Sequence, residues 1–175
     1  MPNKITSKQI INPINFLALG FGSGLFPKMP GTSGSFLALI FAFYFPWLIT
    51  WESVFIASLV GFYICDYCAK KLGVHDHPAI VWDEFCGIWL TLLLINILLQ
   101  LNTPLLTDIG NNLGIWHFVI AFMMFRVFDI TKPWPINIAD KNVNGGVGIM
   151  VDDLLAAVYA SLTSVFIIWL WSILG

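Results

Sequence analysis

The sequence RVFDITKPWPINIADKNVNGGVGIMVDD occupies residues 126–153 and separates two long apolar segments of the chain. It contains seven of the eighteen Asp, Glu, Lys and Arg residues in the whole sequence. The apolar segment that follows, residues 154–174, has about the length of a helix that crosses the hydrocarbon core of a bilayer. Charged side chains next to membrane helices need partners, so we expect residues 126–153 to lie at a membrane edge and to carry function.

The composition is that of a membrane protein. Of the 175 residues, 58% are hydrophobic and 10% are charged, and the mean hydropathy is +0.84, whereas roughly a quarter of the residues are charged in an ordinary soluble domain. We therefore predict an all-α, polytopic membrane helical bundle of one domain, residues 1–175. The net charge of −2 carries no information about partners, and no basic patch with interleaved aromatic residues points to nucleic-acid binding.

Apolar segments predict four to five transmembrane helices. The expected spans cover about residues 36–49, 54–69, 85–101, 115–130 and 154–174. The first two segments are short, so they form either two spans or a hairpin that does not fully cross. Residues 10–19 are expected to form a short interfacial or re-entrant helix.

The basic residues predict the orientation. With five spans and a cytoplasmic N-terminus, all eight lysines and arginines fall on the cytoplasmic side or at its edge. The same count places the polar segments 20–35, 70–84 and 126–153 on that face. We therefore expect functional residues that are distant in sequence to meet at the cytoplasmic end of the bundle.

Two pairs of adjacent acids stand at expected helix starts, Asp83 with Glu84 and Asp152 with Asp153. One acid at a helix start is favoured by the helix dipole, and this is the simplest interpretation of either pair. Two adjacent carboxylates repel each other, however, and a divalent cation relieves the repulsion where lysines are scarce. We therefore also expect an oxygen-ligand site for Mg²⁺, with Ca²⁺ or Mn²⁺ as the next choices. The candidate metal ligands are Asp76, Asp83, Glu84, Asp129, Asp152 and Asp153.

Other charged residues allow simpler interpretations. Asp66 and Asp140 are interpreted as solvated charges at the membrane edge. Arg126 and Asp129 are three residues apart, so they can pair on one face of a helix, which the two following prolines would end.

The glycine- and proline-rich segment 20–35 is predicted to be a loop that leads into a helix. Thr32, Ser33 or Ser35 would cap that helix, and Lys28 would add positive charge for an anion. A tight turn between two helices is an equally good interpretation of this segment.

The three cysteines are predicted to be free and buried, because an odd number cannot form a closed set of disulfides. The alternative is a zinc site made of Cys65, Cys68, His75 and His77, but their spacing is not a usual one for zinc. His75 or His77 is a candidate general acid or base, although a loop histidine beside Asp76 is as often a structural hydrogen-bonding residue.

Four sequence segments, in collinear order, resemble one known family: PGTSGS at 30–35, LGVHDHPAIVWDEFCG at 72–87, FRVFDITKPWPI at 125–136 and GGVGIMVDD at 145–153. They resemble the phosphatidylglycerophosphatase A family of bacteria, over about residues 14–170. The resemblance implies an inner-membrane phosphatase that depends on Mg²⁺. Its substrate would be phosphatidylglycerophosphate, whose terminal phosphate is removed to give phosphatidylglycerol.

The residues themselves agree with such chemistry. A lipid phosphate lies at the membrane surface, so a site at the end of a helix bundle can receive it without extracting the acyl chains. Carboxylate-held Mg²⁺ would screen the phosphate and position water, and the phosphate-binding candidates are Lys132, Arg126, Lys28 and Thr32. The catalytic candidates are His75, Asp83, Glu84, Asp129, Asp152 and Asp153.

A small membrane cation transporter that uses the same acids is the alternative function. It would need acids deep in several helices and a polar path to the far side, where the sequence offers only Glu52 and Asp108. A phosphatidyltransferase would need an Asp-x-x-Asp-Gly motif, which is absent. An oligomer is compatible with either an enzyme or a transporter.

Overall fold

The computed structural model describes residue 5 and residues 7–74, 77–102 and 114–174. Throughout these residues the secondary structure is helical, with turns between the helices and no strands. In chain order the elements are α1 (Ser7–Ile11), α2 (Pro13–Ala18), the 3₁₀ helix η1 (Gly20–Leu25), α3 (Pro30–Tyr44), the 3₁₀ helix η2 (Pro46–Ile49), α4 (Trp51–Leu72), α5 (Trp82–Asn102), α7 (Trp116–Thr131), α8 (Ile136–Asn142) and α9 (Gly145–Leu174). The predicted all-α fold is confirmed.

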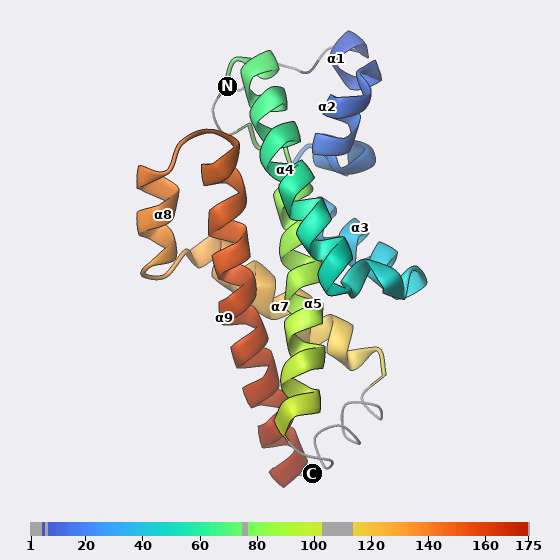
Figure 1. The fold of residues 1–175 in the computed structure, drawn as a ribbon, viewed down its shortest axis with the longest axis vertical. Coiled ribbons are helices and arrows are strands. Elements are labelled where there is room, and N and C mark those ends of the chain that lie inside the picture. Colours follow the sequence, from blue (N-terminus) through green and yellow to red (C-terminus); the bar gives the residue numbers. More distant parts are fainter. Residues whose placement is uncertain (1–4, 6, 75–76, 103–113, 175) are drawn as a thin grey trace.

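The C-terminal helix α9 contacts several other helices of the bundle. It packs against α4, α5, α7 and α8, and Figure 1 shows α5 and α9 side by side along the long axis of the molecule. Small buried residues such as Ala157, Ala160 and Ser164 allow its neighbours to approach closely. By length and apolar composition, three described helices can cross a membrane, namely α4, α5 and α9. The chain is therefore a helical membrane protein.

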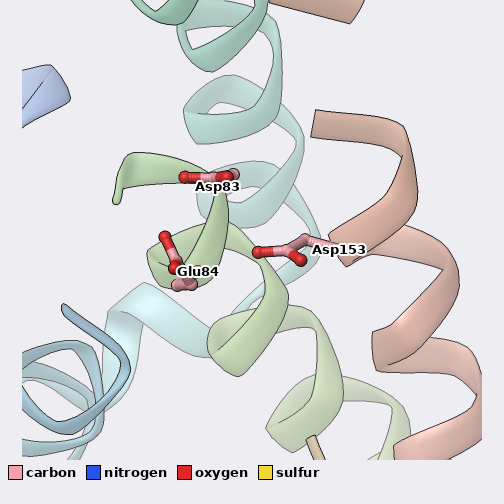
Figure 2. A group of neighbouring side chains, drawn as sticks. All are labelled: Asp83, Glu84 and Asp153. Atoms are coloured by element: carbon pink, nitrogen blue, oxygen red, sulfur yellow. The ribbon is translucent and has the colours of Figure 1, made fainter. Parts of the chain in front are cut away.

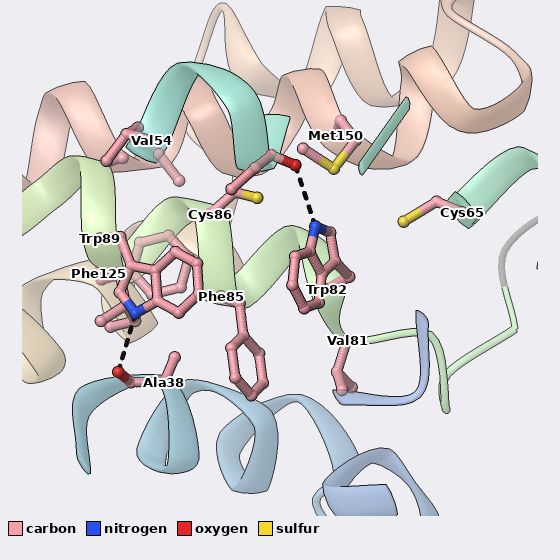
Figure 3. Packing of buried hydrophobic residues seen from close by; sticks show 14 of the residues in the cluster. Ala38, Val54, Cys65, Val81, Trp82, Phe85, Cys86, Trp89, Phe125 and Met150 are labelled. Atoms are coloured by element: carbon pink, nitrogen blue, oxygen red, sulfur yellow. Dashed lines mark hydrogen bonds between the residues drawn. The ribbon is translucent and has the colours of Figure 1, made fainter. Parts of the chain in front are cut away.

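The turn between α3 and α4 lies beside α5 and not at its far end, although α4 with 22 residues is as long as α5 with 21. The indole nitrogen of Trp89, in the first half of α5, donates to the carbonyl of Ala38 at 3.0 Å (Figure 3). Residues Phe45 and Trp47, at the turn between α3 and α4, line one apolar cavity with Trp89. Figure 1 likewise shows this turn beside the middle of α5 rather than at its end. This geometry agrees with the hairpin interpretation of the first two apolar segments.

Two predicted helix starts are wrong. Helix α3 begins at Pro30, so the segment expected to be a loop forms its first turns, and its N-cap residue Met29 makes no side-chain capping bond. Helix α9 begins at Gly145, so Asp152 and Asp153 lie about two turns inside it. The helix-start explanation of that acid pair therefore does not hold.

The physical reason for both errors is close backbone packing. Glycines lower helix propensity and suggested loops, but tertiary contacts override that preference here. A Cβ atom on Gly34 would lie 2.6 Å from Cβ of Val81, and one on Gly146 would overlap the carbonyl oxygen of Phe62. These helices contain glycine because neighbouring chain segments lie too close for a side chain.

The N-terminal segment differs slightly from its prediction as one short helix. The helix is interrupted at Asn12, between α1 and α2. The side-chain oxygen of Asn12 accepts from the backbone N–H of Ile14 at 2.9 Å and so caps α2. The following segment then braces the start of α5, because the backbone N–H of Val81 donates to the carbonyl of Ala18 at 2.9 Å. Trp82 adds a second brace by donating to the carbonyl of Ala57 at 3.1 Å (Figure 3). These contacts fix the position of the acids that follow.

Candidate active site

The three polar segments that the sequence predicted to meet lie around one cavity of about 260 Å³. The start of α3, the loop before α5, the start of α5, the end of α7, α8 and the beginning of α9 form its wall. Its charged lining residues are Asp83, Glu84, Arg126, Asp129, Lys132, Asp140, Asp152 and Asp153. Among the described residues, six acids thus face the same small space as two bases.

Three carboxylates form the most compact part of this set. Asp83 and Glu84 lie in the first turn of α5, and Asp153 reaches toward them from α9 (Figure 2). One oxygen from each lies within 4.8 Å of the others. Each carboxylate also has a buried oxygen without a hydrogen-bond partner, namely Asp83 Oδ1, Glu84 Oε2 and Asp153 Oδ2. Such oxygens are costly to bury, and one cation with oxygen ligands would satisfy all three.

Arg126 connects three helices at the edge of this group. Its guanidinium forms an ion pair with Asp129, as the sequence predicted, and lies 3.9 Å from Oε1 of Glu84. It also donates to the hydroxyl of Ser35 on α3 at 3.3 Å. The carboxylate of Asp129 also lies close enough to that of Asp153 for their negative charges to repel each other. Arg126 therefore orients acids of the cavity, and its own side chain is largely enclosed.

Lys132 ends α7 in the left-handed conformation, with a φ of 40°. Its ammonium group donates to Asp152 on α9 and, at 2.5 Å, to Asp140 on α8. Burial alone would lower the pKa of Lys132, but the hydrogen bonds to the two carboxylates raise it above its usual range. Lys132 is therefore positively charged at neutral pH.

Asp140 is the site residue that the sequence analysis missed. It was interpreted as a solvated charge, whereas it lines the cavity and pairs with Lys132. The sequence carries no signal for this contact beyond the place of Asp140 in the charged segment 126–153, because the pairing depends on how α8 folds back on α9.

Other predicted residues lie elsewhere. Lys28 is exposed in the bend before α3, and neither Lys28 nor Thr32 is among the residues that line the cavity. His75 and Asp76 lie outside the described residues. His77 is buried, and its Nδ1 accepts from the backbone N–H of Ala79 at 3.2 Å, which is a structural contact.

The cysteines agree with the prediction of free, buried thiols. Cys65, Cys68 and Cys86 are all buried and form no disulfide. Within the part of the chain that the structure describes, the group able to hold a metal contains carboxylates and no cysteine or histidine. The arrangement therefore gives no support to a zinc site.

The sequence matches the family model described as Phosphatidylglycerophosphatase A over residues 16–168, a range that contains every residue lining the cavity. A protein of that name from Escherichia coli (strain K12) is 43% identical over 157 residues, which cover 87% of this chain and 82% of the relative. A protein of the same name from Haemophilus influenzae is 39% identical over 174 residues, which cover 97% of this chain and 96% of the relative. This chain belongs to the phosphatidylglycerophosphatase A family.

As a member of the phosphatidylglycerophosphatase A family, the chain is an enzyme of the phosphatase class, and the resemblance seen in its four motifs is confirmed. The transporter alternative is not favoured. A third relative, from Bacteroides thetaiotaomicron, is 36% identical over 152 residues and carries the provisional name phosphatidylinositol-3-phosphatase. These residues cover 82% of this chain and 86% of that relative. No solved structure matches the chain.

The close packing of α3 explains the glycine at position 31 in the PGTSGS segment of this phosphatidylglycerophosphatase A family member. A Cβ atom on Gly31, in the PGTSGS segment, would overlap Oε1 of Glu84 and lie 3.3 Å from the Arg126 guanidinium. Glycine at this position lets α3 close one side of the cavity against both charged groups. The segment thus contributes by its close approach to Glu84 rather than as a loop.

Proposed function

We propose that this protein hydrolyses the terminal phosphate of phosphatidylglycerophosphate to give phosphatidylglycerol and inorganic phosphate, with Mg²⁺ as its cofactor. The names of the relatives support the substrate. The observation that carries the cofactor is the grouping of three buried, unpartnered carboxylate oxygens on Asp83, Glu84 and Asp153. A site made of oxygen ligands favours a hard cation.

Charge balance in the cavity supports the same proposal. Six acids and two bases leave the described lining with an excess of negative charge. A phosphate monoester brings further negative charge, so it can enter only if cations offset the repulsion. Bound Mg²⁺ would supply that positive charge and activate water for attack at phosphorus.

The side chains of the cavity divide the remaining work. Lys132 is the more accessible base, with 27% of its side chain exposed against 14% for Arg126, and it donates to the non-bridging oxygens of the phosphate. Arg126 holds Glu84 and Asp129 in place. Ile80 and Ile149 contribute apolar side chains to the lining of the same cavity.

The reaction joins the oxygen of a water molecule to phosphorus and breaks the bond between phosphorus and the glycerol oxygen of the lipid. A carboxylate of the cavity accepts the proton of the water, and the leaving oxygen takes up a proton. Because the cavity lies where α5, α7 and α9 meet the polar segments, a lipid head group can reach it while its acyl chains stay in the bilayer.

The direct test is phosphate release by the purified protein from phosphatidylglycerophosphate in detergent micelles. We expect release with Mg²⁺ and a loss of about 100-fold or more when a chelator removes the ion, reversed by added Mg²⁺. Phosphatidylinositol 3-phosphate serves as the comparison lipid. No release with Mg²⁺ present would contradict the substrate, and equal release with chelator would contradict the cofactor.

We further propose that the cavity faces the cytoplasm from the bacterial inner membrane. Lys28, Lys70, Lys132 and Lys141 all belong to segments at the cavity end of the bundle, as the positive-inside rule requires of a cytoplasmic face. Helices α5, α7 and α9 then lie between the cavity end and the C-terminus. Their odd number places the C-terminus on the opposite side, and the α3–α4 hairpin does not change this because it returns to the cavity end.

A reporter fused to the C-terminus should therefore be accessible from the periplasm, and one fused to the N-terminus should be accessible from the cytoplasm only. The measurement is labelling of single cysteine tags by a membrane-impermeant reagent in intact and in permeabilised cells. A C-terminal tag that reacts only after permeabilisation contradicts the proposed orientation.

A further inference from the structure

Lys132 is held between two carboxylates that differ in their surroundings. Asp152 lies on α9 inside the bundle, and 9% of its side chain is exposed. Asp140 lies on the seven-residue helix α8, and 38% of its side chain is exposed. Both side chains contact the same ammonium nitrogen, and Asp140 Oδ1 does so at 2.5 Å.

A phosphate bound by Lys132 would lie close to the carboxylate of Asp140. A phosphate oxygen accepting from the ammonium group would lie about 3 Å from its nitrogen, and Oδ1 of Asp140 already lies 2.5 Å from that atom. Asp140 and Asp152 take two of the three N–H donors of the ammonium group. A phosphate on the third donor would face both carboxylates at close range, and this repulsion favours the departure of one of them. Asp140 is the partner that can leave, because it is the more exposed and water can solvate its charge. Asp152 would lose its partner in a buried position.

We propose that Asp140 occupies Lys132 in the substrate-free enzyme and competes with phosphate for it. The inference rests on the role of Lys132 in the proposed function and deepens it. The substrate phosphate displaces Asp140 when it binds, and Asp140 returns to Lys132 when inorganic phosphate leaves. Asp140 is therefore a residue that limits the affinity for phosphate and favours release of the product.

The test is binding of inorganic phosphate to the purified protein in the presence of Mg²⁺, measured by isothermal titration calorimetry. Asp140→Asn keeps the size of the side chain and removes its charge, so we expect phosphate to bind about tenfold more tightly. Asp66→Asn is the matched control, because it removes an acid from another lysine pair, Asp66 with Lys70 at 2.6 Å. This control should bind phosphate as the wild type does. Unchanged, weaker or undetectable binding by Asp140→Asn overturns the proposal.

A second pair of variants tests whether the effect acts through Lys132. In the Lys132→Met background, Asp140→Asn should give no gain in phosphate binding, because the shared partner is gone. An equal gain in that background would show a general effect of charge and overturns the competition. The binding measurement needs no lipid turnover. Failure of the lipid assay with this binding pattern intact would therefore reject the substrate alone, whereas the reverse result would reject the competition alone.

Discussion

Replacing Asp83, Glu84 or Asp153 with its amide should lower phosphate release about 100-fold or more, while the protein still folds and inserts. The amides keep the size of the side chains but remove the charge that holds a divalent cation. Any remaining activity should require a higher Mg²⁺ concentration. The measurement is the rate of phosphate release as a function of Mg²⁺ concentration for each purified variant.

Thermal unfolding in detergent gives a second readout that does not depend on activity. Without Mg²⁺, each amide variant should be at least as stable as the wild type. The amide removes one negative charge from a crowded group of carboxylates whose buried oxygens have no hydrogen-bond partner, and so reduces their mutual repulsion. Added Mg²⁺ should raise the unfolding temperature of the wild type by binding to the folded state, and should raise that of the variants less. Asp66→Asn, whose side chain is not among those lining the cavity, is the control for loss of an acid.

If all three amide variants keep near-normal, Mg²⁺-dependent turnover, the carboxylate site is wrong. The chemistry would then have to lie with the remaining sequence candidates, above all His75. Asp129 and Asp152 are expected to behave differently from the three-carboxylate group, because each already has a basic partner, Arg126 or Lys132. Their amide variants should disturb the placement of those bases as well as the charge.

The location of the site could be predicted from the sequence, because membrane-spanning helices restrict which connecting segments can lie on the same side of the membrane. Once the apolar segments are counted and the lysines and arginines are placed on one side, the segments 20–35, 70–84 and 126–153 must share a face. The cavity indeed contains residues from all three, including Gly31, Asp83 and Asp152. The pairing of Arg126 with Asp129 was also predictable, since a spacing of three residues on a helix is a local property.

The details that depend on tertiary packing could not be predicted. Nothing in the order of the residues shows that Gly31 lies against Glu84, so the glycines at the start of α3 suggested a loop. The partners of Lys132 come from residues eight and twenty positions further along the chain. Which of the many acids it contacts is decided by how α8 and α9 fold around the end of α7. For the same reason Asp140 was assigned no function.

Lys132→Met and Arg126→Met should separate the two bases of the cavity. Loss of Lys132, the more accessible of the two donors, should reduce turnover on the order of 100-fold and weaken phosphate binding, with the protein folded and inserted.

The arginine variant should behave differently. Arg126 is paired with Asp129 and lies near Glu84 in a largely enclosed position, so its loss leaves acids without a partner and should cost about 3–5 kcal/mol of stability. The measurements are phosphate release, phosphate binding and thermal unfolding of each variant. The control for loss of a lysine near the site is Lys141→Met, because Lys141 is exposed. If Lys132→Met unfolds as readily as Arg126→Met while the protein that remains folded is fully active, Lys132 holds α7, α8 and α9 together. In that case another group must bind the phosphate.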